Sequence, residues 1–275
     1  MIPFIIILHI IFVTITANMR CSNESPALIP KYYLIEKCHR SKLGVVARAN
    51  YTSLSSCRRL AIEKKALAFN FSPPEVVNVT DRLEYTCEVL KCAEVSGGLS
   101  LANDTRFDYY SIYARPPPHL NASCVPATGM FQLIKKRLNY TQAETECRNV
   151  SGVLADISTE QRTDTLAQFV ASTKLEAVFV GMRRCNTSKY YNTNGDSLEC
   201  STYRAWAPGH PRKSYQHYDC AVITPHRTWR SISCKKSLPT LCELFPGGPY
   251  KIGSIFRREE KDKSDNVTSI VNNKY

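Results

Sequence analysis

Apolar and polar residues along the first half of this chain follow first a helical period and then strand-like runs. Residues 53–66 have a helical composition, with Cys57, Leu60 and Ala61 at the i, i+3, i+4 spacing of one helix face. Three runs with the length and composition of strands follow, at 67–71, 85–90 and 109–113. This order predicts a helix held across a small sheet.

The second half carries two helix-start signals. Thr141 with Glu144 forms the pattern of a capping box ahead of a helix through Cys147, and Ser158 with Gln161 forms another. We therefore expect two helices early in this half.

A short strand and a long irregular segment come next. Residues 178–182 predict a buried strand, and roughly 40 residues rich in Asn, Ser, Gly, Pro and Tyr follow with little periodicity. A loop of that length inside a compact domain is usually functional.

Proline runs and changes in composition divide the chain. Pro116, Pro117 and Pro118 form a stiff segment, and we place a domain boundary there. After residue 246 the chain enters a charged tail that we expect to be disordered. The predicted order is a signal peptide at 1–17, a domain at 18–115, a Pro-rich linker at 116–123, a second domain at 124–246 and the tail at 247–275.

The N-terminal segment indicates secretion. Residues 1–17 have no formally charged side chain, are almost continuously apolar and end in Ala17, as a secretory signal peptide does. An uncleaved anchor helix is the alternative, although the apolar run is short of the roughly 20 residues that a bilayer requires. We expect a secreted, extracellular protein with no stable membrane insertion after cleavage.

Cysteines and glycosylation sequons agree with that route. The twelve cysteines are an even number and predict six disulfides formed in an oxidising compartment. Of ten Asn-x-Ser/Thr sequons we set Asn70 aside, because Pro73 follows its Ser72. The predicted glycosylation sites are Asn23, Asn50, Asn78, Asn103, Asn121, Asn139, Asn149, Asn186 and Asn266.

Positive charge is concentrated in the second half. The formal net charge is +12, and residues 183–236 alone hold 10 basic and 3 acidic side chains. For a secreted glycoprotein this favours sulfated glycans, acidic proteins or anionic surfaces over nucleic acid as partners. The alternative is a charge that only keeps the protein soluble.

Short motifs in the second half are similar to those of one known family. They are residues 152–157 (Gly-Val-Leu-Ala-Asp-Ile), 179–182 (Phe-Val-Gly-Met) and 206–211 (Trp-Ala-Pro-Gly-His-Pro), followed by 220–222 (Cys-Ala-Val), Trp229, Cys234 and 240–243 (Thr-Leu-Cys-Glu). In this order they resemble a C-type lectin-like domain over residues 124–246. The resemblance implies an α+β fold with two helices, small antiparallel sheets, a long loop, and Trp206 and Trp229 in the core.

The resemblance also implies a set of disulfides. Cys147 would join Cys242, and Cys220 would join Cys234. Cys185 and Cys200 remain inside the domain and would close the start of the long loop. Cys124 has no nearby partner of the kind found in family members with an N-terminal hairpin, so we expect it to pair into the first half.

The first half resembles PAN/apple domains. In that family a cysteine-bearing helix precedes an Ala-Phe-x-Phe-like strand and a Cys-x-x-Leu-like strand, and residues 68–71 (Ala-Phe-Asn-Phe) and 87–90 (Cys-Glu-Val-Leu) fit. The helix has only Cys57 where the family usually has two cysteines. Cys57 to Cys87 is the favoured bond among the fifteen pairings open to Cys21, Cys38, Cys57, Cys87, Cys92 and Cys124.

Where C-type lectins that bind sugars usually hold Ca²⁺, this chain has basic residues. The family uses Glu-Pro-Asn or Gln-Pro-Asp and Trp-Asn-Asp triplets, and residues 210–212 (His-Pro-Arg) and 229–231 (Trp-Arg-Ser) stand in those places. Because Ca²⁺ needs six to eight oxygen ligands, we expect no metal or other cofactor there. The candidate ligand-binding residues form an anion site: His210, Arg212, Lys213, Tyr215, His217 and Arg230.

No motif points to an enzyme. HExxH, Gly-x-Ser-x-Gly and a Gly-rich phosphate loop are all absent from the sequence, and Cys38 beside His39 is expected to be disulfide-bonded and inert. The favoured function is extracellular recognition or adhesion, with a protein or anionic glycan as ligand. The alternatives are a metal-free lectin for neutral glycans, in defence or matrix, and a purely structural matrix component.

Overall fold

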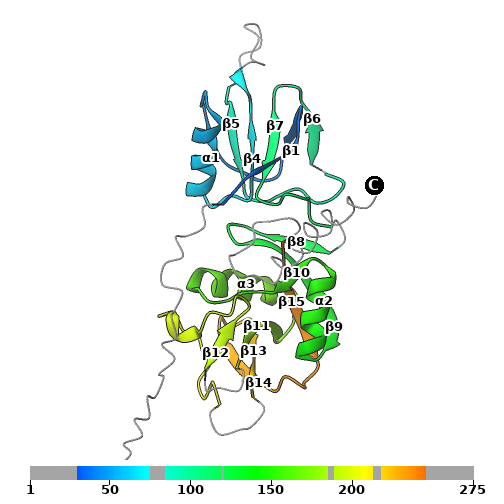
Figure 1. Ribbon diagram of the computed structural model, residues 1–275, viewed down its shortest axis with the longest axis vertical. Helices are drawn as coiled ribbons and strands as arrows, with labels where there is room; N and C mark the ends of the chain where they lie inside the picture. Colours follow the sequence, from blue (N-terminus) through cyan, green and yellow to red (C-terminus); the bar gives the residue numbers. More distant parts are fainter. Residues whose placement is uncertain are drawn as a thin grey trace, which may run out of the picture.

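The computed structural model describes residues 30–74, 84–98, 100–118, 121–184, 189–212 and 218–245. Figure 1 shows two α+β units stacked along the long axis of the molecule. The first holds helix α1 (Leu54–Glu63), and the second holds α2 (Tyr140–Asn149) and α3 (Glu160–Ser172). The predicted signal peptide and the tail from 247 onward lie outside the described residues.

The first unit is built on a five-stranded antiparallel sheet. Its order is β1 (Tyr33–Glu36), β7 (Asp108–Ser111), β4 (Ala68–Phe71), β5 (Cys87–Leu90) and β3 (Val45–Ala49), while β2 (His39–Ser41) pairs separately with β6 (Leu101–Asn103). Every residue of β4 and β5 is buried, because both faces of these central strands are covered. The α+β character predicted for this half is therefore present.

One face of this sheet packs on α1. The helix begins after Ser53, whose side chain accepts a hydrogen bond from the N–H of Ser56. It buries Cys57 and Ala61 against Phe69 of β4, and Cys57 forms a disulfide with Cys87 of β5. The bond favoured from the sequence therefore joins the helix to the sheet.

Asn70 on β4 is fully buried. Its Oδ1 accepts from the N–H of Ser41 at 3.0 Å, and its Nδ2 donates to the carbonyl of Ser41 and to Glu88. A glycan at this side chain would disrupt the fold, which is a structural reason to leave Asn70 out of the predicted glycosylation sites.

The second unit contains an eight-stranded sheet. Its order is β14 (Trp229–Ile232), β13 (Cys220–Ile223), β11 (Val178–Arg184), β15 (Leu238–Leu244), β9 (Gly129–Leu138) and β8 (Ala122–Val125), with β10 (Gly152–Leu154) on β15 and β12 (Tyr190–Asn192) on β11. A short 3-10 helix, η2 (Leu198–Cys200), lies in the long segment after β12. The disulfides Cys147–Cys242 and Cys220–Cys234 are the two pairs that the resemblance implies.

Both helix starts in this unit differ from the predicted ones. The cap of α2 is Asn139, which forms a capping box with Gln142, and the cap of α3 is Thr159. Thr141 lies inside α2, because β9 extends to Leu138 and the helix begins almost directly after it. Ser158 instead bonds Asp156 through both its N–H and its hydroxyl.

The core of the second unit surrounds Trp229, which is fully buried. Its indole N–H donates to the hydroxyl of Thr163 on α3 at 3.1 Å. The rings of Trp206 and Trp229 meet edge to face, with centroids 5.6 Å apart. Trp229 is therefore a core residue, and Trp206, which is partly buried, packs against that core.

The two units share a hydrophobic cluster and a covalent link. Leu90 and Tyr109 of the first sheet pack with Met130 and Leu244 of the second unit. The hydroxyl of Tyr113 accepts a hydrogen bond from the N–H of Met130 at 2.8 Å. Cys124, predicted to pair into the first half, is bonded to Cys92.

Cys38 departs from the predicted pairing. It is a free, exposed thiol in the turn between β1 and β2, at φ +58°, and its N–H donates to Asp108. The expectation that it is bonded is wrong for this structure, because the other described cysteines of the first half are already bonded, Cys57 to Cys87 and Cys92 to Cys124 of the second unit.

Cys200 is also disulfide-bonded, and none of the other described cysteines is its partner. Cys185 lies outside the described residues, as does Cys21. The Cys185–Cys200 bond stays a prediction.

The predicted glycosylation sites fall into two groups. Asn50, Asn103, Asn121 and Asn149 are exposed, and Asn139 is half-buried at the start of α2. Asn23, Asn78, Asn186 and Asn266 lie outside the described residues. No helix in the described ranges is both long and apolar enough to cross a membrane.

Candidate functional site

The long loop of the second unit is tied to the edge strand β14. The N–H of Trp229 donates to the carbonyl of Ala205 at 2.7 Å, and the N–H of Ala207 donates to the carbonyl of Trp229 at 2.8 Å. These bonds fix the loop where it approaches the strand. They bring His210 and Arg212 of the loop beside residues 230 and 231 of β14.

Ser231 is the polar centre of this junction. It is 2% exposed, and its N–H donates to Nδ1 of His210 at 3.0 Å. Its hydroxyl lies 3.0 Å from the same Nδ1 and accepts a hydrogen bond from the N–H of Arg212 at 2.9 Å. The peptide bond between His210 and Pro211 is cis. Ser231 therefore fixes both the imidazole and the backbone that carries the Arg212 side chain.

The imidazole of His210 is held neutral. Partial burial lowers its pKa, and the positive charges of Arg212 and Arg230 lower it further. Because Nδ1 accepts from a backbone N–H, the proton of the neutral ring is on Nε2. His210 therefore contributes one N–H donor.

The side chain of Arg212 is exposed, and its guanidinium lies over the ring of Tyr218. Its guanidinium carbon lies 5.1 Å from the centroid of the Tyr218 ring, and one of its nitrogens is 3.5 Å from the Tyr218 hydroxyl. The carbonyl of Tyr218 in turn accepts a hydrogen bond from the Tyr190 hydroxyl at 2.8 Å. Stacking on an aromatic ring orients the planar guanidinium.

These residues border a groove of about 810 Å³. Besides His210, Arg212 and Arg230, three further basic side chains line it: Arg137 at the end of β9, Lys174 after α3, and Lys236 between β14 and β15. Among the described residues that line it, Glu176 is the single acidic one. We refer to this feature as the basic groove.

Three of the six predicted ligand-binding residues therefore come together, namely His210, Arg212 and Arg230. Lys213, Tyr215 and His217 lie outside the described residues. Arg137, Lys174 and Lys236 were not among the ligand-binding residues predicted from the sequence. The exposed basic run at 135–137 points to Arg137, and the concentration of basic residues over 183–236 includes Lys236.

Comparison with known protein families identifies the second unit. The family described as Lectin C-type domain matches residues 136–244. Residues 136–244 form a C-type lectin domain. The basic groove lies largely on this domain, along β14, the long loop and the start of β15.

Relatives match the same part of the chain. Collectin-10 of Gallus gallus is 26% identical over 115 residues, which are 42% of this chain and 41% of the relative. Collectin-11 of Bos taurus is 25% identical over 115 residues, 42% of this chain and 43% of the relative. The chain thus spans about two fifths of the length of these relatives.

Solved structures with a similar domain include human lithostathine, with a TM-score of 0.41 and 16% identity over 46% of this chain and 98% of that one. Another is the cow C-type carbohydrate-recognition domain of CD23, with a TM-score of 0.40 and 18% identity over 46% of this chain and 94% of that one.

The described residues at the Ser231 junction offer no carboxylate or amide side-chain oxygen for Ca²⁺. Calcium takes six to eight oxygen ligands, mostly carboxylate and amide. His210, Arg212, Arg230 and Ser231 offer two guanidinium groups, one imidazole and a hydroxyl that is already engaged. In the described part of the chain, no three His, Cys, Asp or Glu side chains are grouped so that they could hold a metal ion.

Proposed function

We propose that this chain is a secreted recognition glycoprotein whose C-type lectin domain binds an anionic glycan through the basic groove, without calcium. The observation that supports it is the juxtaposition of Arg212 and Arg230 across the Ser231 junction, where C-type lectins that bind sugars usually hold a metal. Recognition, not catalysis, is the proposed activity.

The groove has the chemistry for sulfate and carboxylate groups. A guanidinium donates two parallel hydrogen bonds to such an anion, and Arg212 is already oriented by Tyr218. Neutral His210 adds an N–H donor without adding a charge that its arginine neighbours would oppose.

Basic side chains on separate walls favour an extended polyanion over a single ion. Arg137, Lys174, Arg230 and Lys236 come from four segments, and none of the four is ion-paired with a carboxylate of the described residues. Exposed single ion pairs contribute little, so affinity would come from several contacts and fall as salt rises. A sulfated or uronic-acid-containing chain has this repeated charge.

For the first half we propose a PAN/apple-like domain that adds a second recognition surface or positions the lectin domain. The Cys57–Cys87 bond between a helix and a central strand supports this proposal. Secretion and glycosylation belong to the same proposal, on the strength of the N-terminal apolar segment and the sequons.

Retention on immobilised heparin tests the groove. The double variant Arg212→Ala, Arg230→Ala should elute at clearly lower salt than the wild type. The matched control is Arg58→Ala, Arg59→Ala, which removes the same charge from exposed positions on α1.

Equal elution of the wild type and the groove variant would contradict the proposal and favour a structural matrix component. An equal shift in both double variants would show that net charge alone governs retention, and that too would contradict a specific groove.

A further inference from the structure

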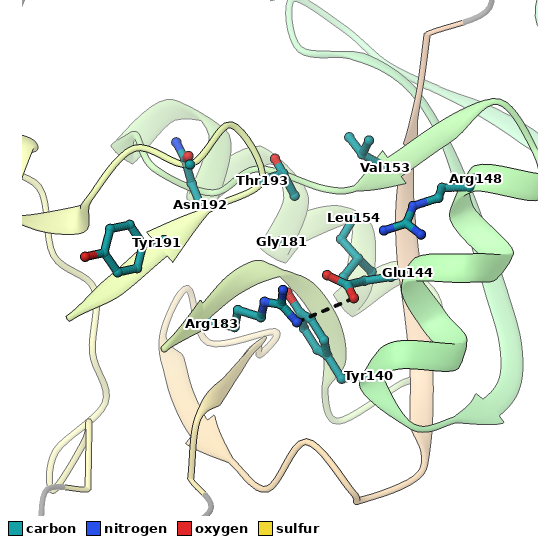
Figure 2. A pocket seen from close by; sticks show the side chains of 11 residues that line it. Tyr140, Glu144, Arg148, Val153, Leu154, Gly181, Arg183, Tyr191, Asn192 and Thr193 are labelled. Atoms are coloured by element: carbon teal, nitrogen blue, oxygen red, sulfur yellow. Dashed lines mark ion pairs between the residues drawn. The ribbon is translucent and has the colours of Figure 1, made fainter. Parts of the chain in front are cut away.

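A second cavity, of about 440 Å³, lies between α2 and the β11–β12 hairpin. The described residues that line it are all different from those that line the basic groove. Its volume is within the range of pockets that hold small ligands. Figure 2 shows the charged side chains of Glu144 and Arg148 on α2 and of Arg183 on β11 among the residues that line it.

One wall of the cavity is a stripe along α2. Tyr140, Glu144 and Arg148 are spaced four residues apart, so they follow one another on the same face of the helix. Tyr140 is buried, Glu144 is half-buried and Arg148 is exposed. The stripe therefore runs from the buried ring of Tyr140 to the exposed guanidinium of Arg148.

Arg183 of β11 faces this stripe. Its guanidinium nitrogen is 3.6 Å from a carboxylate oxygen of Glu144, and its guanidinium carbon lies 5.9 Å from the centroid of the Tyr140 ring (Figure 2). The 3.6 Å between the guanidinium nitrogen and the carboxylate oxygen is too long for a hydrogen bond, so Arg183 and Glu144 both keep their capacity to bond a ligand. Arg148 has no ion pair with a carboxylate of the described residues.

The floor and far wall are apolar or uncharged. Leu154 and Gly181 lie at the back, and Thr193 lies over Gly181 from the turn after β12. A side chain at position 181 would collide with Thr193 and with the carbonyl of Leu154. The glycine therefore permits the close approach that shapes the cavity.

We propose that this cavity binds a carboxylated pyranose, such as a uronic or sialic acid residue of a glycan. Two guanidinium groups, Arg148 and Arg183, flank one carboxylate, Glu144, and leave a net positive charge for the ligand carboxylate. Glu144 and Thr193 accept hydrogen bonds from ring hydroxyls, and the apolar face of the ring lies against Leu154. The site is separate from the basic groove.

A peptide is a poorer match for the same groups. An extended peptide binds by adding to an open strand edge. Here β12 pairs with β11 on one side, and Tyr191 bridges to Ser197 on the other. The groups offered to a ligand are therefore side chains, which suit a compact polar ring.

The test is calorimetric titration with two matched pairs of sugars: cellobiouronic acid against cellobiose, and 3′-sialyllactose against lactose. We expect at least one acidic sugar to bind saturably and its neutral partner not to bind. Arg148→Ala should weaken binding about tenfold or more, because it removes a charge-assisted hydrogen bond to the carboxylate. Arg183→Lys keeps the charge but loses the bidentate geometry and should weaken binding as well.

Arg58→Ala on α1 is the matched control and should bind as the wild type does. Arg212→Ala, Arg230→Ala should also bind normally, which separates this proposal from the one for the basic groove.

The inference is overturned if neither acidic sugar binds, if neutral sugars bind equally well, or if Arg148→Ala has no effect. Loss of binding in the groove variant alone, or tighter binding of a peptide carboxylate than of either sugar, would overturn it too. Arg148 is exposed and has no ion pair with a carboxylate of the described residues, so Arg148→Ala tests the inference even if Arg183→Lys fails to fold.

Discussion

The N–H of Ser231 donates a hydrogen bond to Nδ1 of His210 over 3.0 Å, joining strand β14 to the long loop of the C-type lectin domain. The bond requires an unprotonated Nδ1. Because the hydroxyl of Ser231 also accepts from the N–H of Arg212, protonation of His210 would disturb the residue that holds Arg212 in place.

Acid should therefore loosen this junction. The pKa of His210 is lowered in the folded protein, first by burial and then by Arg212 and Arg230. As the pH falls through the ordinary histidine pKa of about 6.5, the unfolded chain takes up the proton first. The stability that the Ser231–His210 hydrogen bond contributes is therefore present above that pH and is lost below it. Thermal melting at pH 7.5 and pH 5 should show a smaller acid loss in His210→Asn, whose amide oxygen can accept from Ser231.

The control is His226→Asn, the same replacement at an exposed position. If both variants lose as much melting temperature as the wild type between pH 7.5 and pH 5, the Ser231–His210 hydrogen bond is not the cause of the loss of stability in acid.

Calcium should not stabilise the chain. A ligand that binds only the folded state raises the melting temperature, and the guanidinium groups of Arg212 and Arg230 stand where oxygen ligands would be needed. We expect equal melting temperatures in millimolar calcium chloride and in chelator. A rise of several degrees that chelator abolishes, and that Arg212→Ala alters, would show that the groove holds calcium.

The basic groove was only partly predictable from the sequence. Residues 210–212 and 229–231 are found through local motifs, because the tryptophan and proline beside them mark their place in the domain. Arg137 and Lys236 are brought together by the antiparallel pairing of Leu138 with Leu238 in β9 and β15. That register depends on the whole sheet, and no short motif encodes it.

The Cys92–Cys124 bond should contribute measurably to stability. It closes a loop of 32 residues and joins the two units, so removing it in Cys92→Ala, Cys124→Ala should cost about 3 to 4 kcal/mol of unfolding free energy. Urea unfolding measures the loss, and non-reducing peptide mapping should recover the linked peptides. Recovery of Cys124 as a free thiol or in an intermolecular bond would contradict the link.

The cysteine pattern shows a second limit of sequence reasoning. The even number of cysteines predicts that each one is in a disulfide. Cys38 has no disulfide partner among the described residues, and it lies in a turn where its N–H donates a hydrogen bond to Asp108. The same peptide map should show whether Cys200 is joined to Cys185, which we expect because these two cysteines are left over inside the domain.

Gly152→Ala should destabilise the C-type lectin domain. A Cβ at this position would lie 2.5 Å from the carbonyl oxygen of Glu243, the residue of β15 that pairs with Val153. Backbone must shift to relieve that contact, at a cost of about 1 to 3 kcal/mol. An unchanged urea midpoint would show that β10 and β15 can separate freely.

Binding of the purified protein to a glycan array, in calcium and again in chelator, tests the central claim most directly. We predict signals on sulfated or uronic-acid-containing glycans that are equal in the two buffers, fall with added salt, and drop in Arg212→Ala, Arg230→Ala. Signals confined to neutral glycans, or signals that disappear in chelator, would contradict a calcium-free anion site in the basic groove.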